Sequence, residues 1–451
     1  MNPAPLADLY REHLADLDNR YANALSASGF DALAIHSGAL KKRTEFDDQY
    51  WALRPTPHFH HWLPLSEADC GLLVRPGRRP TLFRLKITSF WEKPAILDWD
   101  YFFASFDVVE IEKPEDLKQY LPSDISTNRI AYLGEDRARA TSWGFVEEAI
   151  NPAALIGALD LLRARKTPYE IACITEANRR AAVGHEAVLE RFRAGDFSEL
   201  ELHLAYLAAT RQDDPETPYK NIVALGANSA TLHHVSYLKR AETRPLQSLL
   251  LDAGATFQGY CSDITRTFIK GNGAAATSFA EIIAGVETMQ QRLCDRVKIG
   301  ESYELLHEEA HRQVGAILRD SGIVKLSDEE ISKDQVSRAF FPHGLGHSLG
   351  LQCHDVGCAL VKPKVENPYL RNTSTIVEGQ VFTIEPGIYF IEALLGPLRA
   401  GPHGGDVDWK LVDELATLGG VRIEDDLVVT GGTEVTRNLT RELLPSGGGA
   451  V

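Results

Sequence analysis

The sequence predicts an α+β protein with two domains, because helices and strands occur in separate blocks and because the pattern changes near Lys166. Residues 1–165 combine helices with short apolar strands, which is typical of a small α/β domain. Beyond them, amphipathic helices are followed by strands that resemble antiparallel hairpins with glycine turns. The chain has 451 residues, 44% of them hydrophobic, so each domain can bury a core.

The first domain is expected to begin with a helix. Apolar residues recur at three- and four-residue spacing from Leu6 to Leu25, and Gly29 marks the end of this helix. A closing helix is expected at residues 155–166. Between the two helices, short apolar segments bounded by turn residues predict a strand, a hairpin around a Pro-Gly turn and a further strand, at residues 31–38, 71–86 and 130–134.

The second domain is expected to begin at a helix start. Residues 167–170, Thr-Pro-Tyr-Glu, form a capping box with proline at the first helical position, so a long helix should follow through Arg191. Similar patterns predict helix starts at Ser198 and Ser278. The remaining expected elements are a helix at residues 303–318, strands at residues 246–254, 260–269, 379–390 and 419–430, and a frayed tail at residues 446–451.

The composition excludes several classes of partner. Lys and Arg number 47 against 63 Asp and Glu, so the formal charge is −16, which argues against nucleic acid and anionic membranes as partners. The acidic N-terminus has no apolar run long enough for a signal peptide, so we expect a soluble protein that is not exported. Six cysteines without a C-x-x-C pair indicate a reduced, cytoplasmic compartment.

Four acidic residues occur in apolar strand sequences, where water is not their expected partner. Asp252 follows three leucines, and Asp263 lies in an aromatic and β-branched run. Eleven residues apart on a predicted hairpin, these carboxylates should be neighbours, and both can ionise only with a positive charge between them. A lone strand Asp is more often a cap or a salt-bridge partner, but Glu385 and Glu424 repeat the anomaly. A metal ion is therefore the favoured positive charge.

A histidine-rich segment adds nitrogen ligands. Residues 341–355 contain His343, His347 and His354, and their glycines and proline make a helical zinc-protease motif improbable. Four carboxylates and one imidazole are too many ligands for one catalytic zinc, yet they suit two divalent ions. Oxygen-rich ligation favours Mn²⁺, Co²⁺ or Fe²⁺, with Zn²⁺ less suited. The residues thus predict a dinuclear metallohydrolase.

In their order and context, these residues resemble the metallopeptidases of the pita-bread fold, a family that includes methionine aminopeptidase, aminopeptidase P and prolidase. The match covers residues 166 to about 435, and residues 36–38 and 54–65 resemble the first domain of bacterial prolidases. The resemblance implies a pita-bread catalytic domain at residues 166–451. It also implies that residues 1–165 form a creatinase-type N-terminal domain that helps close the site and makes dimer contacts.

The resemblance also implies the roles of individual residues. Two Mn²⁺-type ions would hold a bridging hydroxide that attacks the carbonyl before a C-terminal proline, and Glu385 would carry its proton. His354, seven residues beyond His347, would steady the oxyanion. The implied metal ligands are Asp252, Asp263, His347, Glu385 and Glu424.

Other residues are implied in substrate binding. His343 and His233 would line the pocket, although His234 is an alternative to His233 because the sequence has two adjacent histidines there. Arg422 is expected to pair with the substrate carboxylate, because a guanidinium can bind it through two hydrogen bonds. Tyr219 resembles a pocket tyrosine, and Cys353 is expected to pack as a small hydrophobic residue.

The expected function is therefore that of a dipeptidase acting on dipeptides with a C-terminal proline, in a homodimer. Aminopeptidase P is the nearest alternative, since it would share every metal ligand but accept longer peptides. Hydrolysis of organophosphate esters is a further expected side activity, because two metal ions can also stabilise a pentacovalent phosphoryl centre. A binding module that has lost its ligands is the third alternative, and the presence of all five argues against it.

Overall fold

The computed structural model describes residues 3–88, 90–91, 93, 97, 99–432 and 435–451 and divides into two compact units. Unit 1 contains the chain up to Arg163 together with Thr167–Ala172, and unit 2 contains Ala164–Lys166 and the chain from Cys173 onward. No helix in the described part of the chain is both long and apolar enough to cross a membrane.

Unit 1 is built on a five-stranded sheet with the strand order β4-β3-β2-β1-β5. β2 and β3 form the predicted hairpin, with Gly71 opposite Phe83. β1 pairs with β5 in parallel and β3 pairs with β4 in parallel, so the sheet is mixed. Its elements are α1 (Pro3–Ala27), β1 (Ala32–His36), α2 (Pro57–Trp62), β2 (Gly71–Val74), β3 (Thr81–Leu85), β4 (Asp107–Ile111), β5 (Ile130–Leu133), α3 (Arg137–Ser142) and α4 (Ala153–Arg163).

Unit 2 contains several smaller sheets between helices. Its largest sheet has four strands in the order β16-β10-β7-β6, and β11, β14 and β15 form a second sheet. The elements are α5 (Pro168–Ala194, which begins in unit 1), α6 (Glu199–Thr210), β6 (Ile222–Leu225), β7 (Leu246–Asp252), β8 (Thr256–Phe257), β9 (Tyr260–Cys261), β10 (Thr265–Gly271), α7 (Ala274–Asp295), α8 (Tyr303–Asp320), α9 (Asp328–Lys333), β11 (Val381–Ile384), β12 (Gly387–Tyr389), α10 (Glu392–Ala400), α11 (Trp409–Ala416), β13 (Gly420–Arg422), β14 (Asp425–Val429), β15 (Thr436–Asn438) and β16 (Gly448–Ala450).

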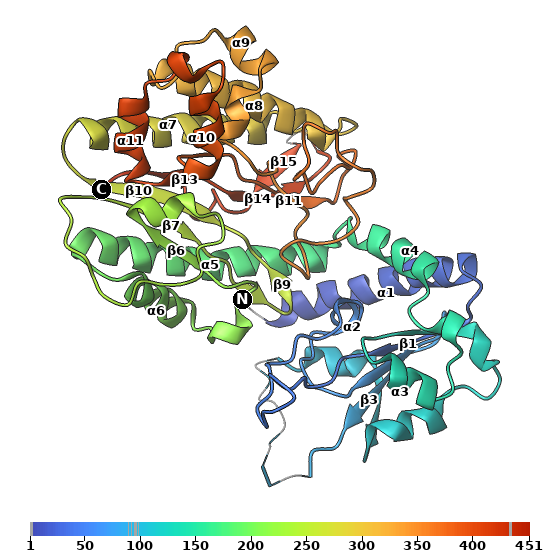
Figure 1. The fold of residues 1–451 in the computed structure, drawn as a ribbon. Helices are drawn as coiled ribbons and strands as arrows, with labels where there is room; N and C mark the ends of the chain where they lie inside the picture. Colours follow the sequence, from blue (N-terminus) through green and yellow to red (C-terminus); the bar gives the residue numbers. More distant parts are fainter. Residues whose placement is uncertain (1–2, 89, 92, 94–96, 98, 433–434) are drawn as a thin grey trace. The chain divides into compact units, whose positions relative to one another are not determined.

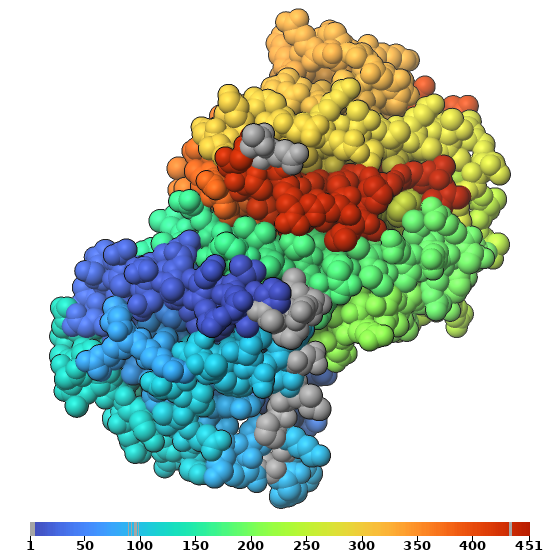
Figure 2. Space-filling view, turned by 180° about the vertical axis from the view of Figure 1, so that it is seen from behind, coloured from blue at the N-terminus to red at the C-terminus, as the bar shows by residue number. Residues whose placement is uncertain are grey.

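The strands of unit 2 lie between two layers of helices (Figure 1). Alternate residues of a strand face opposite sides, so Phe268 of β10 packs in the core that α5 and α6 cover, while Ile269 packs in the core of α7 and α8. On the face shown in Figure 2, the C-terminal residues form a red band between these helix layers. The structure confirms the α+β class, with strands covered by helices on both sides.

Two expectations about the ends of elements in unit 2 were wrong, and two helices near its C-terminus were missed. The helix assigned to Ser278 begins at Ala274, because an alanine run has high helix propensity and extends the helix by one turn. The tail is not frayed, since β16 pairs in parallel with β10. Helices α10 and α11 were not predicted, and in α10 the interior Pro397 obscures the pattern.

The four strand acids lie where strands end or are interrupted. Asp252 is the last residue of β7, and Asp263 lies between β9 and β10. Glu385 separates β11 from β12, and Glu424 separates β13 from β14. The expectation that these acids lie within continuous strands was therefore wrong in detail. Such breaks interrupt the regular alternation of side chains, which lets residues from several strands face one site.

The turn between the two aspartates requires glycine. A Cβ atom at Gly254 would collide with the carbonyl oxygen of Ser262. We predict that Gly254→Ala lowers the free energy of unfolding by about 2 kcal/mol, the usual cost of forcing an extra carbon into a packed region. Gly396→Ala is the matched control, because this position lies inside α10 with ordinary contact distances and alanine favours helices.

Urea denaturation of both variants measures the difference. Equal stability of Gly254→Ala and the wild type would show that the turn can relax around a side chain.

Candidate metal centre

Backbone pairing brings the acid-bearing segments of unit 2 together. Asp252 of β7 lies opposite Thr265 of β10, and the Thr265 carbonyl accepts a hydrogen bond of 3.1 Å from the Glu424 backbone N–H. The Thr265 hydroxyl also donates to Glu424 Oε2 at 2.7 Å. Thr265 therefore links the segments that carry two of the predicted ligands.

The histidine-rich segment runs beside β11 without forming a helix, as predicted. The Thr383 backbone N–H donates to the His347 carbonyl at 2.9 Å, and the Glu385 N–H donates to the Leu345 carbonyl at 2.8 Å. A Cβ atom at Gly346 would collide with the Thr383 carbonyl. Glycine at this position thus allows the close approach that sets His347 beside Glu385.

The buried side chains of Asp263, His347 and Glu424 converge so closely that one ligand atom from each lies within 4.8 Å of the other two. His347 Nε2 is 3.5 Å from Asp263 Oδ2, 3.7 Å from Glu385 Oε1 and 3.9 Å from Glu424 Oε1. All four residues are candidate ligands from the sequence.

Asp252, the fifth candidate, reaches the same group through Tyr219. The Tyr219 hydroxyl lies 2.7 Å from Asp252 Oδ1 and also within hydrogen-bond distance of Asp263 Oδ1. Tyr219 therefore links the two aspartates, and its assignment to the substrate pocket stays a prediction.

The electrostatics of this group are unbalanced. Burial and the neighbouring carboxylates Asp263, Glu385 and Asp252 raise the pKa of Glu424 well above its usual range. Burial likewise raises the pKa of Asp252, against the opposing charge of Arg422.

Glu385 and His347 show the same imbalance. Burial raises the pKa of Glu385 to about 7. Burial alone would lower the pKa of His347, but the hydrogen bond with Asp263 and the charge of Glu385 raise it to about 9. The protein alone therefore neutralises this site by holding protons, which divalent cations would displace.

The donor set fits such cations. Four carboxylates supply hard oxygen ligands and His347 supplies one nitrogen, a mixture typical of sites for Mn²⁺, Fe²⁺ or Co²⁺. Two divalent ions would balance the four negative charges, and bridging carboxylates are the usual means of holding two ions close together.

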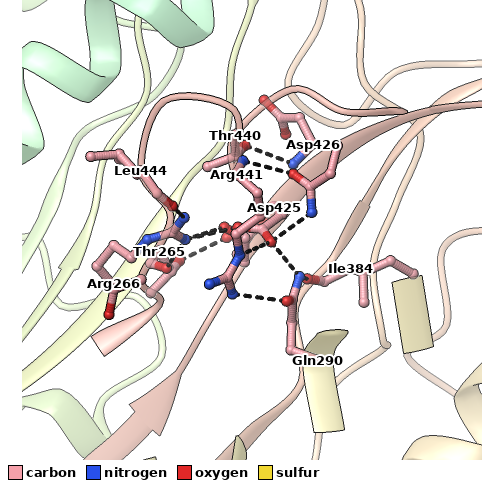
Figure 3. A network of polar contacts seen from close by, with 12 residues as sticks. Thr265, Arg266, Gln290, Ile384, Asp425, Asp426, Thr440, Arg441 and Leu444 are labelled. Carbon is pink, nitrogen blue, oxygen red and sulfur yellow. Dashed lines mark hydrogen bonds and ion pairs between the residues drawn. The ribbon is translucent and has the colours of Figure 1, made fainter. Parts of the chain in front are cut away.

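A buried polar network surrounds Asp425, the residue after Glu424 in the chain. Figure 3 shows Arg266, Gln290 and Arg441 around Asp425. Arg266 Nη1 donates to the Glu424 carbonyl at 2.9 Å and lies 2.9 Å from Asp425 Oδ1. Arg441 and Gln290 donate to Asp425 Oδ2 at 2.6 and 2.8 Å. The negative charge of Asp425 is paired with Arg266 and Arg441, so this carboxylate is balanced without metal ions.

A second acid of this network supports Asp263. Asp426 Oδ2 accepts hydrogen bonds from the Asp263 backbone N–H at 3.0 Å and from Asn178 Nδ2 at 2.8 Å. Burial and the charge of Asp263 raise the pKa of Asp426 well above its usual range. Neither Asp425 nor Asp426 was singled out from the sequence, although both directly follow Glu424.

The two other histidines of the segment flank the site. The ring of His354 lies 4.4 Å from that of His347, measured between centroids, and His354 is exposed. His343 Nε2 is 2.8 Å from the Tyr389 hydroxyl, and His343 Nδ1 is 3.7 Å from Glu385 Oε2. Desolvation lowers the pKa of His343 to about 3 and, together with the charge of His347, that of His354 to about 4, so both rings are neutral at neutral pH.

The geometry distinguishes His233 from His234. His234 Nε2 lies 2.8 Å from the buried carboxylate of Glu199, which makes it a structural residue. His233 is exposed, and its charge influences the pKa values of His343 and His354, so it lies close to both. We therefore favour His233 over His234 as the candidate pocket histidine.

Arg422 does not have the free guanidinium that the carboxylate-clamp assignment requires. It is 4% exposed, and its nitrogen atoms donate to Asp252 Oδ2 at 2.5 Å, to the Tyr389 hydroxyl at 2.9 Å and to Thr265 Oγ1 at 3.2 Å. Because these protein groups occupy it, Arg422 holds Asp252 in place. We therefore propose a positioning role for Arg422, while the expected substrate-binding role stays a prediction.

One positively charged side chain near the site, that of Arg371, was not identified from the sequence. Arg371 is exposed and lies close enough to the site that its charge lowers the pKa of His354, after burial and His347. Its segment lacks apolar periodicity, so no sequence signal linked it to the site.

The expectation for Cys353 was also wrong. Its thiol does not pack only against apolar groups, because Cys353 Sγ lies 2.9 Å from Asp263 Oδ2. Burial and the Asp263 charge raise the pKa of the thiol well above its usual range, so the metal-free protein holds it protonated. None of the six cysteines, all of which lie in the described part of the chain, forms a disulfide.

Solved structures with the same fold include aminopeptidases P. A proline aminopeptidase P II from Yersinia pestis is 24% identical, with a TM-score of 0.74 over 95% of this chain and 96% of that one. A Zn-substituted aminopeptidase P from E. coli is 22% identical, with a TM-score of 0.72 over 95% of both chains. At these identities the likeness establishes the pita-bread fold.

Similar sequences extend over nearly the whole chain. Proteins named Xaa-Pro dipeptidase from Pseudoalteromonas atlantica and Marinobacter nauticus are each 40% identical, over 97% of this chain and 99% and 98% of their own. Residues 8–161 match the family model for the N-terminal domain of Xaa-Pro dipeptidase. Residues 172–431 match the model for metallopeptidase family M24. The chain therefore belongs to metallopeptidase family M24.

Proposed function

We propose that the protein is an Xaa-Pro dipeptidase, which hydrolyses the peptide bond before a C-terminal proline in dipeptides. The observation that carries this proposal is the convergence of three carboxylates, those of Asp263, Glu385 and Glu424, on His347 in a member of a metallopeptidase family. Tyr219 links a fourth carboxylate, that of Asp252, to the same group. Relatives named Xaa-Pro dipeptidase match the chain over nearly its entire length, which supports this substrate class.

Two divalent ions are proposed as the cofactor, with Mn²⁺ favoured by the oxygen-rich donor set and Co²⁺, Fe²⁺ or Zn²⁺ as alternatives. When bound, such a pair supplies a nucleophilic hydroxide at neutral pH and stabilises negative charge on the carbonyl oxygen. The residues that would hold the two ions are Asp252, Asp263, His347, Glu385 and Glu424.

Glu385 is the proposed catalytic acid and base. A carboxyl group works best in this role when its pKa lies near the working pH, and that of Glu385 is raised to about 7 in the metal-free protein. Its Oε2 atom faces His343 Nδ1 at 3.7 Å, so a proton can be held at this oxygen beside a neutral ring.

The neutral histidines are proposed to act on the substrate. His354 is exposed beside His347, where its ring N–H can donate to the oxyanion as negative charge develops. His343 is anchored by Tyr389 at Nε2 and by the Gly344 carbonyl at Nδ1, and it is proposed to line the pocket beside Glu385. His233 is proposed to line the same pocket, close to both rings.

We propose Arg371 as the partner of the substrate carboxylate, in place of Arg422. It is an exposed guanidinium near His354, whereas the protein already occupies Arg422. A charged hydrogen bond to a carboxylate contributes about 1.5–3 kcal/mol, which corresponds to a factor of roughly 10 or more in binding.

We also propose that residues 1–165 and 166–451 are separate domains, the first of which takes part in site closure and dimer contacts. Separate family models match residues 8–161 and 172–431, and the two compact units meet in the sequence between residues 163 and 173. We propose that the protein is a homodimer located in the cytoplasm. Light scattering of the purified protein measures its oligomeric state.

Substrate length distinguishes the proposal from its nearest alternative, an aminopeptidase P. Solved aminopeptidases P have the same fold as this chain, so the fold does not separate the two activities. We predict that Mn²⁺-loaded protein cleaves an Xaa-Pro dipeptide with at least a tenfold higher kcat/KM than an Xaa-Pro-containing tripeptide. Chromatographic quantitation of the released amino acid measures both rates. A preference for the tripeptide would identify an aminopeptidase P instead.

Arg371→Ala tests the carboxylate contact. The variant should raise KM for an Xaa-Pro dipeptide at least tenfold while leaving KM for the corresponding dipeptide amide nearly unchanged, because the amide lacks the charge that Arg371 binds. Arg312→Ala is the matched control, because this exposed guanidinium pairs with Glu309 on the surface of α8. If Arg371→Ala affects acid and amide equally, the contact is not with the carboxylate.

A further inference from the structure

A thiol and two imidazoles form a second group of potential ligands at the edge of the carboxylate cluster. One nitrogen from each of His347 and His354 and the sulfur of Cys353 lie within 4.8 Å of one another. The two rings are nearly perpendicular, at 84°, with centroids 4.4 Å apart. An ion placed among these three residues would therefore have two nitrogen ligands and one sulfur ligand.

This group extends from the interior to the surface. His347 is buried, Cys353 is half-buried and His354 is exposed, so an ion can enter from solvent at His354. Cys353 Sγ lies 2.9 Å from Asp263 Oδ2. This carboxylate can accept the thiol proton when an ion binds sulfur, and the proton can then leave to solvent.

The chemistry of this group differs from that of the carboxylate cluster. Nitrogen and thiolate ligands favour thiophilic ions such as Zn²⁺ and Cd²⁺, whereas the carboxylates favour Mn²⁺. His347 belongs to both groups, because its Nε2 atom also faces Asp263, Glu385 and Glu424. A single imidazole cannot serve both sets of ligands in their preferred geometries at the same time.

We propose that His347, Cys353 and His354 form a binding site for a thiophilic divalent cation that competes with the oxygen-rich centre for His347. Binding forms one metal–sulfur bond and releases the thiol proton, and it involves no change of oxidation state. The inhibitory consequence rests on the proposed function, since the bound cation removes His347 from the catalytic ions and His354 from the substrate. The cation site itself does not depend on that function.

Cadmium provides a spectroscopic test of the site. Mn²⁺-loaded wild-type protein is titrated with Cd²⁺ while the ultraviolet thiolate-to-Cd²⁺ charge-transfer band and the dipeptidase activity are recorded together. We predict a band that saturates at one equivalent per chain, with activity lost in parallel. In Cys353→Ala the band should be absent, and the Cd²⁺ or Zn²⁺ concentration for half inhibition should rise at least about tenfold.

Two further variants control for misfolding and for binding of the cation to another thiol. Cys353→Ser preserves size and hydrogen bonding and should also lose the band, which covers the case in which the alanine variant does not fold. Cys261→Ala is the matched control, because Cys261 is a nearby buried thiol that donates to the Leu351 carbonyl and lies outside the group. The control should keep both the band and the inhibition.

Two results would overturn the proposal. One is a wild-type protein that shows no charge-transfer band, and the other is a band of equal intensity in the Cys353 variants. Both of these results concern the charge-transfer band, which does not require peptidase activity. A failure of the proposed function would appear separately, as the absence of dipeptide cleavage by the Mn²⁺-loaded protein.

Discussion

Four carboxylates share one buried site with too few positive charges to balance them. Asp252 pairs with Arg422, while Asp263, Glu385 and Glu424 share the single imidazole of His347 at 3.5, 3.7 and 3.9 Å. In a low-dielectric environment such a group is stable only if it takes up protons or cations. The raised pKa values of Glu385 and Glu424 correspond to the uptake of protons. Metal binding would supply cations in their place.

Much of the surrounding fold counteracts the repulsion among these acids. Tyr219 links two of them, and Thr265 donates to a third. In the network around Asp425 (Figure 3), Arg266 binds both the Asp425 carboxylate and the backbone carbonyl of Glu424. Glu424 is therefore held in position without bound ions. A site prepared in this way loses little conformational freedom when cations bind, which favours tight and selective binding.

The sequence was sufficient to identify the acids, because a carboxylate in an apolar run is an anomaly that can be seen without a structure. It was also sufficient for the histidine-rich segment, whose glycines exclude a helix. It could not define the roles of Arg422 and Cys353, because these depend on which groups approach from distant segments. Arg422 meets Asp252 across 170 positions in the chain, and Cys353 meets Asp263 across 90.

The errors in the fold have similar causes. β16 is a glycine-rich tail with no strand pattern of its own, and it becomes a strand only because β10 offers an unpaired edge. The breaks at Glu385 and Glu424 could not be seen either, since apolar residues continue on both sides of each acid. Local propensity thus predicted the longer helices well, while contacts distant in sequence decided the short strands and the site.

The exchange of protons for cations is the central claim, and calorimetry of metal binding tests it most directly. Metal-free protein is titrated with Mn²⁺ in buffers of different ionisation enthalpy, from about pH 6 to pH 9. Because the cluster holds protons that cations displace, we expect two Mn²⁺ per chain, net proton release near neutrality and an affinity that rises with pH. Binding without proton release, or with an affinity that does not depend on pH, would contradict the account.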